Sequence, residues 1–109
     1  MNSFIQVITT IENKGQAEQL ASTIVGSRLA ACAQIAGPIT STYWWNDKLE
    51  TAEEWQIAFK TTQDAYAELE TVLKEHHPYQ VPEILAIPVL GGNVAYLKWI
   101  TAEVKRAAI

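Results

Sequence analysis

Apolar residues recur along this chain in turn at the spacing of a strand and at the spacing of a helix, and each change of spacing predicts a new element. Residues 4–10 (FIQVITT) are rich in β-branched side chains, which favours a strand. Asn13, with Gln16 three residues later, resembles a capping box, so we expect a helix to begin there and to end near Arg28. Its apolar positions recur at helical spacing and predict one buried face: Ala17, Leu20, Ala21, Ile24 and Val25.

A long hairpin is predicted next. Residues 31–45 (ACAQIAGPITSTYWW) indicate a strand interrupted at Gly37-Pro38, where proline cannot donate to a ladder and a bulge, bend or edge is expected. Asn46-Asp47-Lys48 is typical of a turn, and residues 49–62 return as a third strand. The alternating apolar positions of that strand are Trp55, Ile57 and Phe59.

The remaining residues predict two more helices and one short strand. Thr62 is expected to cap a helix with Asp64 in its first turn, and Asn93 to cap the last helix. Between them, residues 84–89 predict a fourth strand, which Gly91-Gly92 ends. The two helices should bury Ala65, Leu69, Val72 and Leu73, and then Leu97, Ile100 and Val104.

This order of elements predicts an α+β fold, the ferredoxin-like β-α-β-β-α-β sandwich with a C-terminal helix and helices on one face of an antiparallel sheet. We expect residues 1–109 to form a single domain with one core. A formal net charge of −4 without a basic face argues against nucleic acid or an anionic membrane as the main partner. No apolar stretch is long enough to span a bilayer, and the first ten residues lack the features of a signal peptide. The single cysteine, Cys32, excludes an intrachain disulfide, so a cytoplasmic location is expected.

The predicted hairpin is too long for a monomer. Residues 31–45 would extend about 45–50 Å at about 3.3 Å per residue, whereas a compact domain of this size is about 34 Å across. Trp44 and Trp45 point to opposite faces of the strand, so both cannot enter one core. We therefore expect a homo-oligomer whose interface contains Tyr43, Trp44, Trp45, Tyr96 and Trp99.

The stretch EHHPYQVPEI, residues 75–84, admits two interpretations. As the end of a helix, His76 would continue the buried face after Leu73, and His77 would leave the helix because Pro78 follows it. As a metal site, His77 would offer an imidazole. Adjacent helical residues diverge by about 100°, so His76 would not share that ion. The candidate ligands are Cys32, His77 and Glu83, or groups from another chain.

Other chemistry has weaker support in the sequence. Gly91-Gly92-Asn93 could hold an anion at a helix start, but a turn with an asparagine cap explains it better. Lys60, with Glu53 or Glu54, could line a subunit cleft or be solvated. No motif or spacing indicates catalytic residues, so we expect a protein that is not an enzyme.

Several segments together resemble the CutA1 divalent-cation tolerance proteins. They are RLAACAQI (28–35), GPITSTYWWNDKLE (37–50), Glu54 with FKTT (59–62), HPYQVPEI (77–84) and YLKWI (96–100). The resemblance implies a ferredoxin-like homotrimer with its sheets facing inward and an architecture similar to PII signalling proteins. It also implies a response to divalent metals such as copper in bacteria, and in animals a link to acetylcholinesterase anchoring. The family usually carries glutamate where this chain has Gln80, so a negative charge is lost.

Two functions follow as hypotheses. The first is a trimeric divalent-cation tolerance protein that binds copper or a similar ion weakly, with no firmly assigned cofactor. The second is a PII-like signalling or interaction module that binds a small ligand or a protein partner in clefts between subunits.

Overall fold

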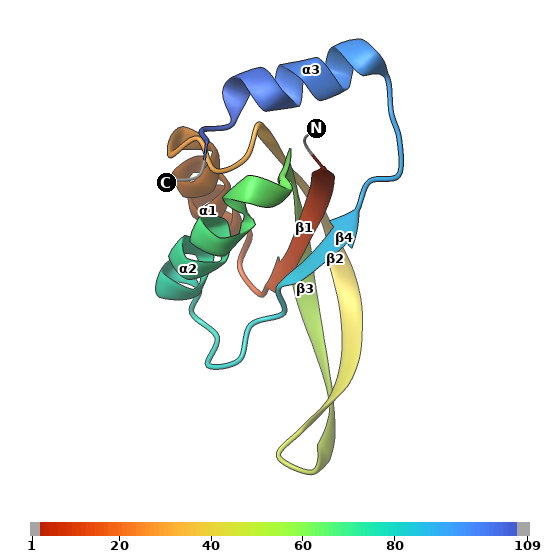
Figure 1. Cartoon of the computed structure of the whole chain (residues 1–109). Helices are drawn as coiled ribbons and strands as arrows, with labels where there is room; N and C mark the ends of the chain where they lie inside the picture. Colours follow the sequence, from red (N-terminus) through yellow and green to blue (C-terminus); the bar gives the residue numbers. More distant parts are fainter. Residues whose placement is uncertain (1–2, 107–109) are drawn as a thin grey trace.

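A four-stranded antiparallel sheet forms the centre of the molecule, as predicted. The computed structural model describes residues 3–106, and its strands lie in the order β2-β3-β1-β4 (Figure 1). The elements in chain order are β1 (Phe4–Ile11), α1 (Lys14–Gly26), β2 (Cys32–Trp45), β3 (Lys48–Thr62), the 3₁₀ turn η1 (Gln63–Ala65), α2 (Tyr66–His76), β4 (Leu85–Pro88) and α3 (Val94–Glu103).

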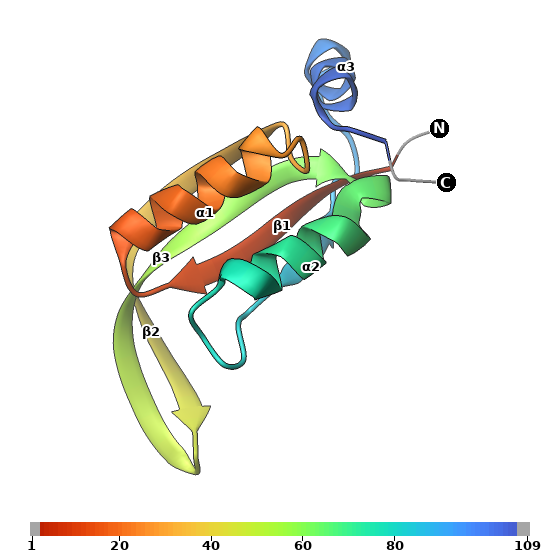
Figure 2. The same cartoon turned by 90° about the vertical axis from the view of Figure 1, so that its left-hand side faces the viewer.

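Helices α1 and α2 cover one face of the sheet, and α3 lies across one end (Figure 2). The main core lies between those two helices and strands β1 and β3. Burying each large aliphatic or aromatic side chain there contributes about 1.5–3 kcal/mol. Its largest fully enclosed apolar members are Phe59, Ile11, Ile24, Leu29, Ile57, Leu69, Leu73 and Val7. A smaller cluster of Ala65, Ile100 and Val104 attaches α3 to the body.

Two of the three predicted helix caps are confirmed. The side chains of Asn13 and Asn93 each accept a hydrogen bond from the backbone N–H three residues later. Thr62 makes no such bond, so that prediction was wrong. Thr62 still pairs with Phe4 as a strand residue, and the chain enters α2 through the 3₁₀ turn instead.

The end of α1 is formed without glycine in the left-handed position. The helix ends at Gly26, and Arg28 adopts a φ of 63°. The N–H of Leu29 then donates to the Ile24 carbonyl and that of Arg28 to the Val25 carbonyl. This is the Schellman pattern, which satisfies two carbonyls that the helix end would leave free.

The hairpin of β2 and β3 extends far beyond the body, as the sequence predicted (Figure 1). The described residues measure 44 × 27 × 24 Å along the principal axes. The register between the strands shifts between Ala36 and Ile39, which places the predicted bulge at Gly37-Pro38. Asn46 and Asp47 close the hairpin with positive φ angles of 50° and 61°, as a tight type I′ turn requires.

Candidate functional site

The segment that follows α2 packs against the end of β1 and the base of the hairpin. His77 is buried, and its Nε2 lies 2.9 Å from the Thr10 carbonyl oxygen. Its Nδ1 accepts the Tyr79 N–H at 3.1 Å, so Nε2 carries the proton and donates to Thr10. Both ring nitrogens are therefore engaged, and a metal-binding role for His77 would require the Tyr79 bond to break.

The burial of His76 differs from the prediction. His76 is exposed, so the expectation that it continues the buried face of α2 was wrong. That face ends at Leu73, because His77 leaves the helix and turns back to cover the end of β1. The His76 Nδ1 lies 2.9 Å from the Val72 carbonyl oxygen. Nδ1 must donate there, which leaves the Nε2 lone pair of His76 free.

A hydrogen bond from Tyr79 to Glu54 connects this segment to the hairpin. The Tyr79 hydroxyl donates to Glu54 Oε2 at 2.7 Å, and the Tyr79 ring packs edge-on against His77 at 4.7 Å between centroids. Burial raises the pKa of Tyr79, and the hydrogen bond and negative charge of Glu54 raise it further. Tyr79 therefore remains a neutral hydrogen-bond donor, and Glu54 is 7% exposed beneath it.

A pocket of about 710 Å³ opens between residues 41–45 of the outer hairpin, Glu54, the end of β1 and the segment that begins at Tyr79. It contains the predicted ligand Glu83 together with Glu12 and Glu54. Burial raises the pKa of Glu83, and the nearby Glu54 carboxylate adds to that shift. Gln80 also lines the pocket, so a glutamate at its position would have added a fourth acid.

The predicted metal ligands do not meet within one chain. Cys32 pairs with Lys60 on β3, whereas Thr10, the partner of His77, pairs with Gln56. Four residues of strand therefore separate the two places, about 13 Å. Within residues 3–106, no group of three or more His, Cys, Asp or Glu side chains could hold a metal ion. A closed metal centre does not fit the described part of a single chain.

Cys32 lies instead beside the last helix. Its Sγ is 3.6 Å from the Tyr96 hydroxyl, and the thiol is partly exposed. The hydrogen bond with Cys32 and burial raise the pKa of Tyr96. Nearby, Lys60 donates to Gln34 at 2.7 Å rather than pairing with either glutamate considered for it.

All five predicted interface side chains are exposed. Trp44 is 73% exposed and Trp45 is 42% exposed, on opposite faces of the hairpin. Tyr43, Tyr96 and Trp99 are similarly accessible, and the rings of Tyr96 and Trp99 lie 5.5 Å apart. A monomeric protein rarely exposes this much aromatic surface to solvent.

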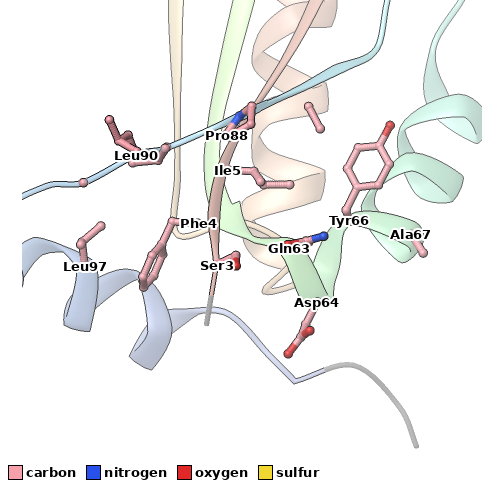
Figure 3. A pocket seen from close by; sticks show the side chains of 13 residues that line it. Ser3, Phe4, Ile5, Gln63, Asp64, Tyr66, Ala67, Pro88, Leu90 and Leu97 are labelled. Carbon is pink, nitrogen blue, oxygen red and sulfur yellow. The ribbon is translucent and has the colours of Figure 1, made fainter. Parts of the chain in front are cut away.

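A second hollow, of about 800 Å³, lies at the opposite end of the sheet. Figure 3 shows Phe4, Leu90 and Leu97 on one side of it and Gln63, Asp64 and Tyr66 on the other. It contains none of the predicted metal ligands. The neighbouring Gly91-Gly92-Asn93 turn uses the Asn93 side chain as a helix cap, as the simpler interpretation required.

Sequence reasoning missed the contact between Glu54 and Tyr79. The two residues are separated by 25 positions and by a whole helix. Nothing in the sequence indicated this contact, because Glu54 shares its strand face with Gln56, Ala58 and Lys60 and alternates with the apolar Trp55, Ile57 and Phe59. Glu12 and Thr10 gave no signal beyond their place at the end of the first strand.

Comparison with known proteins gives the family. Residues 5–103 match the family model described as CutA1 divalent ion tolerance protein. The chain belongs to the CutA1 family. It is 41% identical over 99 residues to the divalent-cation tolerance protein CutA of Yersinia pestis, covering 91% of this chain and 83% of the relative.

Solved CutA1 structures share the fold closely. The CutA1 crystal structure from Oryza sativa superposes with a TM-score of 0.92 at 37% identity and covers 94% of each chain. CutA from Synechococcus elongatus gives a TM-score of 0.91 at 33% identity, covering 96% of this chain and 93% of that one. The family model and the Yersinia pestis relative are both described by tolerance to divalent cations. No helix within residues 3–106 is long and apolar enough to cross a membrane.

His77 makes the stability of this CutA1 protein sensitive to acid. Burial lowers the pKa of His77 below its ordinary 6.5, although the Thr10 carbonyl and the Glu54 carboxylate oppose that shift. The unfolded chain therefore takes up this proton first as the pH falls. The stabilising contribution is complete above about 6.5 and is lost as the pH drops through the folded-state pKa.

We expect urea unfolding at a fixed protein concentration to show this loss between neutral and acidic pH. His77→Gln retains a donor for the Thr10 carbonyl and cannot titrate, so its stability should fall less steeply over the same range. Glu83 has a raised pKa and contributes with the opposite sign, but it is present in both proteins and cancels in their difference. Parallel curves for the two proteins would contradict this role of His77.

Proposed function

We propose that this CutA1 protein acts in tolerance to divalent cations as a cytoplasmic homotrimer that binds copper or a similar ion weakly. The observation that carries the proposal is the exposed aromatic surface on the hairpin and α3, in a chain whose relatives are named for divalent-cation tolerance. The unpaired thiol of Cys32 supports a reducing setting.

The shape of the chain supports assembly through this surface. The hairpin reaches beyond its own body and leaves Tyr43, Trp44 and Trp45 exposed, where another chain would cover them. Large aromatic side chains bury about 150–250 Å² each when fully covered. Tyr96 and Trp99 add a second aromatic area on α3. A closed ring of identical chains would cover these areas without leaving a free hairpin.

Light scattering tests this assembly directly. In dilute buffer the measured mass should be about three times the 12.1 kDa chain mass. The mass should stay at that value across the micromolar range, because burial between chains stabilises the folded state by mass action. A single species of chain mass at micromolar concentration would refute the trimer.

We expect copper binding to be weak because the candidate ligand side chains do not lie close together. No closed site exists within the described residues of one chain, so we expect individual surface groups to contact the ion. His76 offers a free and exposed imidazole nitrogen, whereas both nitrogens of His77 are engaged. The thiol of Cys32 and the carboxylate of Glu83 remain candidate ligands, alone or with groups from a neighbouring chain.

Copper titrations of two variants decide between the histidines. His76→Ala should weaken copper binding severalfold, and His77→Gln should leave it close to that of the parent protein. Metal ligands must be deprotonated, so the parent's affinity should be lower in acidic than in neutral buffer. Equal affinities in the parent and His76→Ala, with no dependence on pH, would place the ion away from both histidines.

Binding of a small ligand is a second candidate function, in the manner of a PII-like signalling module. The pocket around Glu54 and Tyr79 favours it, because three carboxylates and several aromatic rings line one hollow. A protein partner would likewise bind in the clefts between subunits.

A further inference from the structure

The outer part of the hairpin is a two-stranded ribbon that the rest of its sheet does not support. Strand β1 ends at Ile11, whose partner on β3 is Trp55, whereas β2 and β3 continue as a pair as far as Trp45 and Lys48. Two strands alone are at best marginally stable in water, and they twist strongly. Figure 2 shows this ribbon turning away from the body where β1 ends. The direction of the ribbon therefore depends on contacts at its root.

The root contains a feature that would act as a hinge by itself. The bulge at Gly37-Pro38 interrupts the pairing of β2 with β3 beside Glu54 and Trp55. A bulge bends the strand that carries it, and a glycine there adds backbone freedom. Without contacts from elsewhere in the molecule, the ribbon would be free to swing about this point.

The side chain of Trp55 braces the root on the face of the sheet that the helices cover. Its ring lies directly over the bulge, since a Cβ built at Gly37 would be 2.8 Å from the ring. The Nζ of Lys14, at the start of α1, lies 5.2 Å from the ring centroid in a cation–π contact. The ring also packs against the main core. Trp55 thereby connects the bulge of β2 to the first turn of α1.

Glu54 braces the same root on the opposite face. Neighbouring strand residues point to opposite faces, so Glu54 lies on the face that the helices leave open. Its carboxylate is buried, and Oε2 accepts a hydrogen bond of 2.7 Å from the Tyr79 hydroxyl. Tyr79 is held in turn, because its N–H donates to the Nδ1 of His77 and its ring packs edge-on against the His77 ring. The segment after α2 therefore holds β3 at the point where Trp55 holds it from the other side.

We infer that Trp55 and the hydrogen bond between Tyr79 and Glu54 form a two-sided clamp, which fixes the direction of the outer hairpin within one chain. The exposed aromatic side chains of the ribbon are then already oriented before another chain covers them. Preorganisation of this kind reduces the conformational entropy that is lost on association. That consequence rests on the proposed assembly, whereas the clamp itself does not.

The distance between two spin labels tests the clamp. Lys48→Cys at the end of the ribbon and Ser22→Cys on α1, both at exposed positions, carry the labels in a Cys32→Ser background. Refolding with an excess of unlabelled protein restricts the measured distances to those within one chain. We expect one narrow distance distribution for the parent and a broader one after Trp55→Leu or Tyr79→Phe.

Two conservative variants should retain the clamp. Trp55→Phe keeps an aromatic ring over the bulge, and Glu54→Gln keeps an oxygen that accepts the Tyr79 hydroxyl. Both distributions should stay close to that of the parent. Tyr79→Phe removes a single oxygen atom, so it still tests the clamp if urea unfolding shows that Trp55→Leu does not fold.

Trp45→Ala separates the clamp from the assembly. This variant should form smaller species at low micromolar concentration and yet keep the narrow distribution, because the clamp lies within one chain. A distribution that broadens as much in Trp45→Ala as in Trp55→Leu would mean that contacts between chains fix the hairpin, which overturns the inference. Distributions for Trp55→Leu and Tyr79→Phe as narrow as that of the parent would overturn it as well. A parent that is monomeric in light scattering and still gives the narrow distribution would exclude the trimer and support the clamp.

Discussion

Replacing Trp45 with alanine should destabilise the assembled protein by about 3–5 kcal/mol, the cost of removing a large aromatic side chain that is fully packed. In the isolated chain Trp45 is still 42% exposed, so a loss of this size requires a neighbouring chain to cover the rest of its surface. Thermal unfolding should therefore shift to lower temperature, and light scattering at low micromolar concentration should show smaller species. Both effects should weaken as the protein concentration rises.

Two matched variants make the result for Trp45 interpretable. Thr51→Ala changes an exposed residue of the same hairpin, so it should leave mass and unfolding temperature unchanged. Trp44→Ala removes the tryptophan on the opposite hairpin face and reports whether one face or both are covered. If Trp45→Ala unfolds like the parent and retains its mass, the side chain does not anchor the assembly.

Gly37→Ala should also be strongly destabilising, for reasons internal to one chain. Gly37 has a φ of +156°, which L side chains rarely adopt, and such backbone strain costs about 1–3 kcal/mol. A Cβ would also lie 2.8 Å from the Trp55 ring and 3.1 Å from the Glu54 carbonyl oxygen, and overpacking of this kind costs about 1–3 kcal/mol. We expect the two costs together to lower the free energy of unfolding by at least about 2 kcal/mol.

Gly91→Ala is the control for that experiment. No atom lies within 4 Å of a Cβ built at Gly91, and its φ is outside the strained range, so the substitution should change stability little. Urea unfolding of the two variants beside the parent measures the difference. Equal stabilities for Gly37→Ala and Gly91→Ala would mean that the bulge relaxes around a side chain.

Local signals in the sequence predicted most of the fold because their causes are local. Asn13 and Asn93 cap helices through bonds that span three residues, and Gly37-Pro38 interrupts a ladder by its own backbone chemistry. Thr62 failed as a cap because pairing with Phe4, distant in sequence, kept it in the strand. Tertiary pairing overrode a local preference at that position.

The candidate site was less predictable because its contacts are long-range. Helical spacing assigned His76 to the core. Instead the extended backbone of His77, just before Pro78, brings the His77 ring to Thr10, which is 67 residues earlier in the chain. The contact between Tyr79 and Glu54 likewise depends on how the hairpin base meets the loop. Spacing on one helix cannot reveal which of two adjacent side chains turns inward when the helix ends between them.

The bulge at Gly37-Pro38 determines which residues of the outer hairpin lie on which face. From the pair Ala36–Gln56 to the pair Ile39–Glu54, β2 advances by three residues and β3 by only two. Odd-numbered residues of β2 beyond the bulge therefore lie on the face that even-numbered residues of β2 occupy before it. Trp45 consequently lies on the Glu54 side and Trp44 on the other. Removing one residue at the bulge would exchange the two tryptophans between faces, whereas lengthening both strands by two residues would preserve them. To keep Trp45 on the Glu54 face, each outer strand must therefore change in length by a multiple of two residues between the bulge and the tryptophans.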